Sequence, residues 1–599
     1  MNPFPPLPEI EALLSTPQAR ELQQLRLAVL RNITVEAIEP YLRYLAHAQG
    51  FNAEVKFGGF DQLMQEAVGG ARDLLLPDLD AVLVFAYLSQ LSQAVATGFA
   101  GLSKEQLAQE TERLRVYFEE VVQGIRRQTD AMILWHGLEP PLHPALGIRD
   151  AQLPDGQSAT VARLNDLLRT TLTGLPNAFL VDMAGCLARV GAPEFYDDRF
   201  WHLARAPYSR LALAHIAGED FKFLRALKGR AKKCLVLDCD NTLWGGIVGE
   251  DGLKGIQLGK DHPGSVFSEF QKEIVSLFHR GVIIALCSKN NEADVWEVFD
   301  RHPDMLLKRE HIAAWRINWE DKPANLRALA AELNIGLDSM VYVDDSEFEA
   351  GLVRRELPEV HTLCLSGEQR LRSRAVLASC GLFDAPRLTE EDRHRGRMYQ
   401  ADAGRRRARS QSTDLESYCR TLAMRLEIGR GDEFTIPRIA QQTQKTNQFN
   451  LTTRRYSEAD IARFVASPEH DVLWVRVSDT FGDLGIVGVC ILRYDGEQAD
   501  IDTFLLSCRA LGRGVEARFL AEALQVARSR GARTVTGRYL KTGKNAQTEG
   551  FYAGHGFQEI EAARTSDGRT FLKPLDNLAP PDAGHFVEIV RPCAATQRS

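Results

Sequence analysis

Two aspartates follow directly on an apolar run in the stretch CLVLDCDNTLWGG, residues 234–246. Asp238 and Asp240 are two residues apart, and side chains at positions i and i+2 of a strand point to the same side. Both carboxylates can therefore converge on one pocket. Two acids this close repel each other unless a cation lies between them, and Mg2+ with oxygen ligands meets that need.

Three other segments supply polar groups of the same kind. Asp344 and Asp345 follow an apolar run in YVDDSE, Ser288 follows another in GVIIALCS, and Lys322 lies in EDKPAN. Acids, a hydroxyl and a lysine at strand ends suit phosphoryl transfer, in which an aspartate attacks phosphorus while a metal and the lysine neutralise developing charge. A single aspartate of this kind would be explained by a turn or a helix cap. The four segments together favour chemistry.

A parallel, doubly wound sheet is the element that must position these residues. Strand-like runs end at Asp238, Ser288 and Asp344, and the helical patterns FSEFQKEIVSLFHR, EADVWEVFDRH and KPANLRALAAELN separate them. Ligands of such sheets bind at the carboxyl ends of the strands. Only about 45 residues lie between Thr242 and Ser288, which is too few for a full cap domain, so we expect an open site.

In order and spacing, DCDNT, the serine of CSKN, the lysine of DKPAN and VDDSE resemble the four motifs of the haloacid dehalogenase (HAD) superfamily. The resemblance implies that Asp238 is the nucleophile and that Asp240 protonates the leaving group and later activates water. It implies that Ser288 and Lys322 hold the phosphoryl oxygens. It also implies a Mg2+ cofactor bound by Asp238, Asp240, Asp344 and Asp345.

We expect this capless HAD-like domain over residues 230–382, after an N-terminal α/β domain at 1–229. The predicted strands of the N-terminal domain are residues 25–33, 52–58, 80–88, 159–164 and 177–183, and helical patterns alternate with them. The domain resembles a degenerate SGNH-hydrolase-like fold. Asn32 stands where the nucleophilic serine would be, which disfavours hydrolysis here. His202, near Asp198, is expected to be structural.

A third, α+β domain is expected over residues 421–575, after an arginine-rich helical linker at 383–420 and before a tail at 576–599. In CRALGRGVE, Arg509, Gly512 and Gly514 form an R-x-x-G-x-G pattern between a strand and a long amphipathic helix. Glycines there expose backbone N–H groups at a helix N-terminus, which suits a pyrophosphate. With the downstream FYAGHGF, the pattern resembles the GNAT acyltransferase fold. That resemblance implies a groove for coenzyme A or a phosphopantetheine arm, bound by Arg509, Gly512, Arg513, Gly514, Asn545 and Tyr552.

The joint pattern is more specific than either half. DCDNTLWGGIVGEDG, LCSKNN, KTNQFNLTTRRY and LSCRALGRGVE together resemble the FkbH-like family over about residues 232–557. The resemblance implies transfer of the glyceryl group of 1,3-bisphosphoglycerate, removal of its phosphates, and loading of glycerate as a thioester on an acyl carrier protein for polyketide-type biosynthesis. The amides and arginines of KTNQFNLTTRRY could hold the glycerate hydroxyls or a phosphate, or could simply form a helix terminus and a turn.

Cys508 is our candidate for the thiol that carries the acyl group, because a neighbouring arginine and a helix N-terminus lower the pKa of a thiol. The alternative is that Cys508 is a small buried apolar residue. Cys239 and Cys287 alternate with pocket-facing positions on their strands, so we expect both in the core. The seven arginines between Arg393 and Arg409 could meet an acidic carrier protein or form a solvated helix face.

Composition limits the remaining possibilities. The chain has 599 residues, 44% of them hydrophobic, and a formal net charge of -8, which gives no sign of general nucleic-acid binding. Ten cysteines without a C-x-x-C pair disfavour structural zinc and disulfides. The start lacks a basic region before an apolar run, and no apolar run is long enough to span a bilayer. We therefore expect a soluble cytoplasmic protein with no membrane partner.

Two other functions stay open on the sequence alone. One is a separate Mg2+-dependent phosphatase of a small phosphorylated metabolite, with an inert GNAT-like domain. The other is a CoA-dependent N-acetyltransferase with a regulatory HAD domain. An acidic residue placed as an amine base in the third domain would favour the latter, and Asp502 and Glu516 are the candidates.

Overall fold

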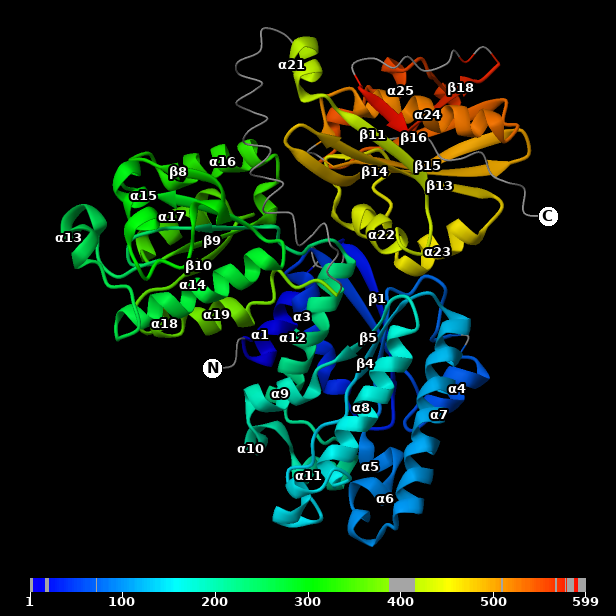
Figure 1. Cartoon of the computed structure of the whole chain (residues 1–599). Helices are drawn as coiled ribbons and strands as arrows, with labels where there is room; N and C mark the ends of the chain where they lie inside the picture. Colours follow the sequence, from blue (N-terminus) through cyan, green and yellow to red (C-terminus); the bar gives the residue numbers. More distant parts are fainter. Residues whose placement is uncertain are drawn as a thin grey trace. The chain divides into compact units, whose positions relative to one another are not determined.

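The computed structural model describes residues 4–16, 21–71, 73–386, 415–507, 510–565, 568–576, 578 and 586–590. The chain divides into two compact units, Met1–Lys228 and Gly229–Ser599 (Figure 1). The first unit contains one parallel sheet, and the second contains a parallel and a mixed sheet. The expected multidomain α/β class is confirmed. Among the described residues no helix is both long and apolar enough to cross a membrane.

A five-stranded parallel sheet in the order β2-β1-β3-β4-β5 forms the centre of the first unit. Its strands are β1 (Gln23–Arg31), β2 (Phe51–Phe57), β3 (Ala81–Phe85), β4 (Met132–His136) and β5 (Ala178–Val181). The main helices are α1 (Leu7–Leu14), α3 (Glu39–His47), α4 (Leu63–Gly69), α7 (Lys104–Gln128), α8 (Gln157–Thr173), α9 (Met183–Val190), α11 (Asp198–Ala204) and α12 (Arg210–Leu227). Side chains alternate along β1, so that Leu27 and Val29 belong to one core and Ala28 and Leu30 to the other.

The predicted strand at residues 159–164 is wrong, because these residues lie inside helix α8. The buried residues of α8 recur at a helical spacing, at Thr160, Val161, Leu164, Leu168 and Leu172. A window of six residues is too short to distinguish the helical period of about 3.6 residues from the two-residue period of a strand. The strand that the sequence analysis failed to predict is β4. Its five residues are all buried, so they show no alternation of apolar and polar residues.

The second unit begins with a lobe, residues 229–386, that we call the parallel-sheet lobe. Its strand order is β10-β9-β6-β7-β8, with β6 (Cys234–Leu237), β7 (Ile283–Ser288), β8 (Ile312–Ile317), β9 (Met340–Asp344) and β10 (His361–Cys364), all parallel. The helices are α13 (Val248–Gly255), α14 (Gly264–His279), α15 (Glu292–Arg301), α16 (Lys322–Leu333), α17 (Glu347–Glu356), α18 (Glu368–Leu371) and α19 (Ser373–Ser379). Leu235 and Leu237 pack into one core and Cys234 and Val236 into the other, so both faces of the sheet are covered.

The rest of the second unit, residues 415–590, we call the mixed-sheet lobe. Its sheet has the order β17-β18-β16-β15-β14-β13-β11-β19. The strands are β11 (Arg425–Arg430), β13 (His470–Asp479), β14 (Gly482–Asp495), β15 (Gln498–Leu506), β16 (Thr534–Leu540), β17 (Gln558–Glu559), β18 (Gly568–Pro574) and β19 (Glu588–Val590). The helices are α21 (Leu415–Leu422), α22 (Ile436–Lys445), α23 (Glu458–Ala466), α24 (Val515–Ser529) and α25 (Phe551–Gly554). Helices α22 and α23 cover one face of the sheet and α24 the other (Figure 1).

A short strand, β12 (Phe449–Asn450), lies where β15 and β16 separate. These two parallel strands pair only along residues 498–501 and 534–537. Beyond that point β12 pairs with the last two residues of β15, and the N–H of Leu540 donates to the carbonyl of Leu451 at 2.8 Å. The gap between the strands is thus filled by the chain itself, by part of the segment KTNQFNLTTRRY.

Candidate functional site

Asp238, Lys322 and Asp344 meet at the carboxyl edge of the parallel sheet, where the sequence places a site. Lys322 is the first residue of α16, and its Nζ lies 2.6 Å from Asp238 Oδ1 and 3.2 Å from Asp344 Oδ2. The same Nζ donates to the carbonyl of Cys287 at 2.8 Å. Ser288 ends β7 and is 1% exposed. Three strands and one helix therefore bring together the residues of the four motifs.

Charges in this cluster shift the pKa values of its members. Burial raises the pKa of Asp238 to about 6, and Asp344 adds to the rise while Lys322 and Ser288 oppose it. Burial would lower the pKa of Lys322, but the adjacent Asp238, Cys287 and Asp344 raise it above its ordinary value, which favours the charged form. The cluster contains one cation and two buried carboxylates. A further positive charge would compensate the excess negative charge.

Asp240 lies beside this cluster with a different set of contacts. Its Oδ1 accepts hydrogen bonds from Trp244 Nε1 at 2.8 Å and from the N–H of Val248 at 3.1 Å, and its Oδ2 accepts one from Asn290 at 2.7 Å. Burial raises its pKa, although these three hydrogen bonds work in the opposite direction. A carboxyl that is fixed in place and has a raised pKa is suited to donate and accept a proton.

A metal ion would fit among three carboxylates, Asp238, Asp344 and Asp345. One oxygen from each carboxylate lies within 4.8 Å of the others. Among the described residues, these three therefore form a group that could hold a cation. The carboxylate of Asp240 does not belong to the group. Asp345 also accepts from Arg370 at 3.0 Å, and burial followed by the charge of Asp344 raises its pKa. Oxygen ligands and clustered negative charge are what Mg2+ prefers.

Three residues of the site escaped the sequence analysis. Asn290 and Trp244 bond to Asp240, and the hydroxyl of Tyr342 donates to Asp344 Oδ2. Asn290 follows Ser288 by two residues, and Tyr342 precedes Asp344 by two. The i, i+2 spacing along a strand end was therefore a usable signal for both.

The cysteines near the motifs are buried in the core, as the strand alternation predicts. Cys239 packs with Leu235 and Leu237, and Cys287 packs with Cys234 and Val236. Burial raises the pKa of Cys287 to about 12 and moves that of Cys239 well above its ordinary value. Neither thiol forms a thiolate readily. Cys508 and Arg509 lie outside the described residues, as do the arginines between Arg393 and Arg409.

In the mixed-sheet lobe, the glycines of the R-x-x-G-x-G pattern lie at the start of helix α24. Gly512 and Gly514 have φ values of 71° and 77°, a left-handed conformation that favours glycine, and Gly514 is the N-cap. The N–H of Gly512 donates to Glu516 at 2.6 Å, and Arg513 lies 4.0 Å from Asp479. The turn expected from the sequence is present, and its binding role stays a prediction.

Asn545 and Tyr552, the other two predicted binding residues, have buried side chains. Asn545 Nδ2 donates to the carbonyls of Asn450 at 2.9 Å and Leu540 at 2.8 Å, so it holds β12 against β16. Tyr552 is 1% exposed and packs against Gly537, where an added Cβ would lie 2.5 Å from its ring. Both side chains therefore make structural contacts inside the mixed-sheet lobe, and their role in binding a cofactor stays a prediction.

In the first unit, Asn32 follows β1 and exchanges hydrogen bonds with the backbone of Tyr87, at 2.7 and 3.3 Å. His202 and Asp198 lie on α11 and are exposed. A buried pair that the sequence analysis missed lies on β4 and α12, where His136 Nε2 is 3.0 Å from Asp220 Oδ1. Since His136 Nδ1 also contacts the carbonyl of Val84, this pair ties the sheet to a helix.

No protein-family model and no curated protein matches the chain. Among solved structures, the N-terminal part of the protein BF1531 from Bacteroides fragilis, which contains a phosphatase domain and was crystallised with Mg, is 27% identical with a TM-score of 0.57. The match covers 64% of this chain and 100% of that one. This chain is therefore similar, over most of its length, to a structure that contains a phosphatase domain.

Two acetyltransferase structures match smaller shares of the chain. The GNAT domain of S. lividans PAT is 15% identical with a TM-score of 0.21 and covers 24% of this chain and 89% of its own. The PaiA N-acetyltransferase of Thermoplasma acidophilum, in complex with coenzyme A, is 17% identical with a TM-score of 0.17 and covers 19% of this chain and 66% of its own.

Proposed function

We propose that the chain is a Mg2+-dependent phosphatase of the HAD type, with Asp238 as nucleophile. The observation that carries the proposal is the meeting of Asp238, Lys322 and Asp344 at one sheet edge, with Asp240 fixed beside them. The similarity to a structure with a phosphatase domain, crystallised with Mg, supports it.

The proposed reaction assigns a role to each of these groups. An oxygen of the Asp238 carboxylate attacks phosphorus, and the bond from phosphorus to the ester oxygen breaks as Asp240 gives that oxygen its proton. Asp240, now a carboxylate, takes a proton from water, and the hydroxide attacks the phosphoryl group on Asp238. The aspartyl–phosphorus bond breaks, which returns the Asp238 carboxylate and yields inorganic phosphate. Lys322 and Ser288 hold phosphoryl oxygens.

Asp238, Asp344 and Asp345 are the residues that would hold Mg2+. When bound, the ion would offset the charge of the carboxylates and of the phosphate and so favour their close approach. The test is phosphate release from a panel of phosphate esters with Mg2+, with excess chelator, and after Mg2+ is restored. We expect loss and recovery of activity, and full activity in the chelator would overturn the metal requirement.

The finer proposal is that the phosphatase serves acyl transfer to a carrier protein. A thiol would attack the acyl phosphate of 1,3-bisphosphoglycerate, the bond from the acyl carbon to the phosphate oxygen would break, and the remaining phosphate ester would be hydrolysed at Asp238. The FkbH-like motifs support this sequence of steps, and in this proposal the turn at Gly512 and Gly514, at the start of α24, would bind the anionic part of the phosphopantetheine arm. The glycerate thioester would pass to the phosphopantetheine arm of the carrier.

Mass spectrometry of a holo acyl carrier protein tests this proposal after incubation with the chain, Mg2+ and 1,3-bisphosphoglycerate. We expect the mass of a glyceryl group on the carrier. If Cys508 is the intermediate carrier, the chain itself gains that mass without the acyl carrier protein, and Cys508→Ala loses it while phosphate release persists. An unmodified carrier would reduce the proposal to a phosphatase of small metabolites.

An N-acetyltransferase is the less favoured alternative. Of its candidate amine bases, Asp502 accepts hydrogen bonds from Tyr456 and Arg454, and Glu516 accepts one from Gly512. Both carboxylates therefore have hydrogen-bond partners within the mixed-sheet lobe.

A further inference from the structure

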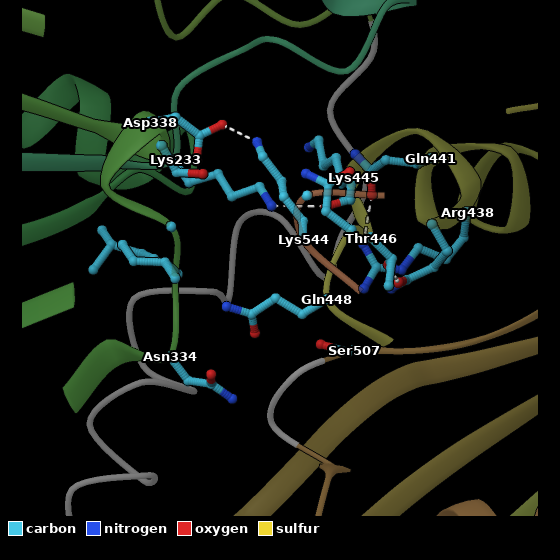
Figure 2. A pocket seen from close by; sticks show the side chains of 17 residues that line it. Lys233, Asn334, Asp338, Arg438, Gln441, Lys445, Thr446, Gln448, Ser507 and Lys544 are labelled. Atoms are coloured by element: carbon cyan, nitrogen blue, oxygen red, sulfur yellow. Dashed lines mark hydrogen bonds and ion pairs between the residues drawn. The ribbon is translucent and has the colours of Figure 1, made fainter. Parts of the chain in front are cut away.

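A cavity of about 360 Å3 lies within the second unit, away from the carboxylate cluster. It is formed by the amino edge of the parallel sheet, helix α22, the loop that leads to β12, and the residues that follow β15 and β16 (Figure 2). A volume of roughly 300–1,000 Å3 is usual for a small-molecule site. Its apolar lining includes Ile283 and Ile335.

The charged side chains around this cavity are predominantly positive. Among the described residues, Lys233, Arg438, Lys445 and Lys544 line it, against a single acid, Asp338. Figure 2 shows Lys544 extended toward Asp338, with which it forms an ion pair. Burial would raise the pKa of Asp338, but Lys544, Lys232 and Lys233 together hold it below its ordinary value. The excess of basic side chains among the described lining residues favours an anion.

Neutral polar groups complete the lining, and they can donate and accept hydrogen bonds. They are Asn334, Ser339, Gln441, Gln442, Thr446, Asn447, Gln448 and Ser507. Several of them are held by other residues: Gln442 Nε2 donates to the carbonyl of Ile486 at 2.9 Å, and Asn447 Oδ1 accepts from Arg455 at 2.6 Å. Amides and hydroxyls fixed in this way recognise hydroxyl groups, while lysines recognise phosphate.

The cavity is separate from the proposed phosphatase site. Lys233 precedes β6 and Asp238 follows it, so the two lie at opposite ends of one strand. Five residues of extended chain span about 17 Å. A ligand in the cavity therefore cannot contact the carboxylate cluster unless it is much longer than a small metabolite.

We propose that this cavity is a second anion site that binds a small hydroxylated phosphate monoester. The lysines bind the phosphate, and the amides and hydroxyls from α22 and the β12 loop bind the hydroxyl groups. Because Lys233 Nζ also donates to the carbonyl of Lys445 at 2.7 Å, a bound ligand adds to contacts that join the two lobes of the unit. The inference does not depend on the phosphatase reaction.

Calorimetric titration with glycerol 3-phosphate tests it, in full-length Asp238→Asn protein with excess chelator. These conditions remove both the nucleophile and the metal, so neither hydrolysis nor the carboxylate cluster contributes. We expect saturable binding, competition by inorganic phosphate, and no binding of glycerol at the same concentrations. Absence of saturable binding would overturn the proposal, whatever the outcome for phosphatase activity.

A matched pair of variants, added to the same protein, separates an anion site from a merely structural ion pair. Lys544→Gln and Asp338→Asn break the same contact but change the charge of the cavity in opposite directions. We expect about tenfold weaker binding for Lys544→Gln and equal or tighter binding for Asp338→Asn. Weaker binding in both variants would assign the pair to structure and overturn the proposal. Lys272→Gln, at a partly exposed ion pair with Glu269, is the control and should bind as its parent does.

Discussion

Lys322 provides the positive charge that allows the acids of the candidate site to be buried. Its side chain is 2% exposed and lies within 3.2 Å of oxygens from both Asp238 and Asp344. A buried ion pair adds little net stability, but the loss of one partner leaves an uncompensated charge that is costly. The residue therefore has a structural role beside the proposed catalytic one.

We expect Lys322→Met to lower the free energy of unfolding of the metal-free protein by about 3 kcal/mol, because two buried carboxylates lose their cation. Urea unfolding measures this, and added Mg2+ should restore part of the loss. Lys272→Met is the control, since the side chains of Lys272 and its partner Glu269 are 57% and 41% exposed and the substitution should change stability by less than about 1 kcal/mol. Equal effects of the two substitutions would contradict the account.

The pKa of Asp238 predicts how Mg2+ binding depends on pH. Protons and the metal compete for the same carboxylate, whose pKa burial raises to about 6 in the metal-free state. Below that pH the carboxyl is mostly protonated, so the affinity for Mg2+ should fall as pH decreases, by about fivefold from pH 6 to pH 5. Calorimetric titration at several pH values measures it. An affinity independent of pH between 5 and 7 would place the ion elsewhere.

At the scale of elements, the mixed sheet depends on a contact that only glycine allows. Gly537 on β16 faces the ring of Tyr552, and an added Cβ would lie 2.5 Å from it. Tyr552 in turn packs against Phe557 and Phe571 in the core of the lobe. The ring therefore has no room to move aside.

Gly537→Ala should consequently destabilise the mixed-sheet lobe by about 1–3 kcal/mol through overpacking. Gly554→Ala is the matched control, because no atom lies within 4 Å of the Cβ that it would introduce. Thermal unfolding of both variants measures the difference. If Gly537→Ala proves as stable as Gly554→Ala, Tyr552 is loosely packed and its predicted role in binding a cofactor regains support.

The sequence predicted the features that depend on residues close together in the chain, but not the contacts between residues far apart in it. Asp238, Ser288 and Asp344 each end an apolar run, so their meeting at one sheet edge followed from strand order. Asn545 was predicted to bind a cofactor from a motif, whereas its contacts with β12 depend on chain folding across 95 residues. The cavity was equally hidden, since Lys544 and Asp338 are 206 residues apart.

At the scale of the whole molecule, the residues of the candidate site lie in the second unit. All the residues of the carboxylate cluster lie after Gly229, where the second unit begins. We expect residues 229–599, produced without the first unit, to release phosphate within about threefold of the full chain, because a compact unit holds its own core. A folded fragment without activity would assign the first unit a part in catalysis.

The identity of the nucleophile is the central claim, and phosphate release by Asp238→Asn tests it most directly. The amide of asparagine is nearly isosteric with the carboxylate, and its oxygen can still accept a hydrogen bond from Lys322, so the variant should fold. The amide cannot attack phosphorus. We predict a loss of activity of about a thousandfold or more, against an unchanged rate for Asp300→Asn, a partly exposed acid of the same lobe. Phosphate release at the parent rate from a well-folded Asp238→Asn protein would contradict the account.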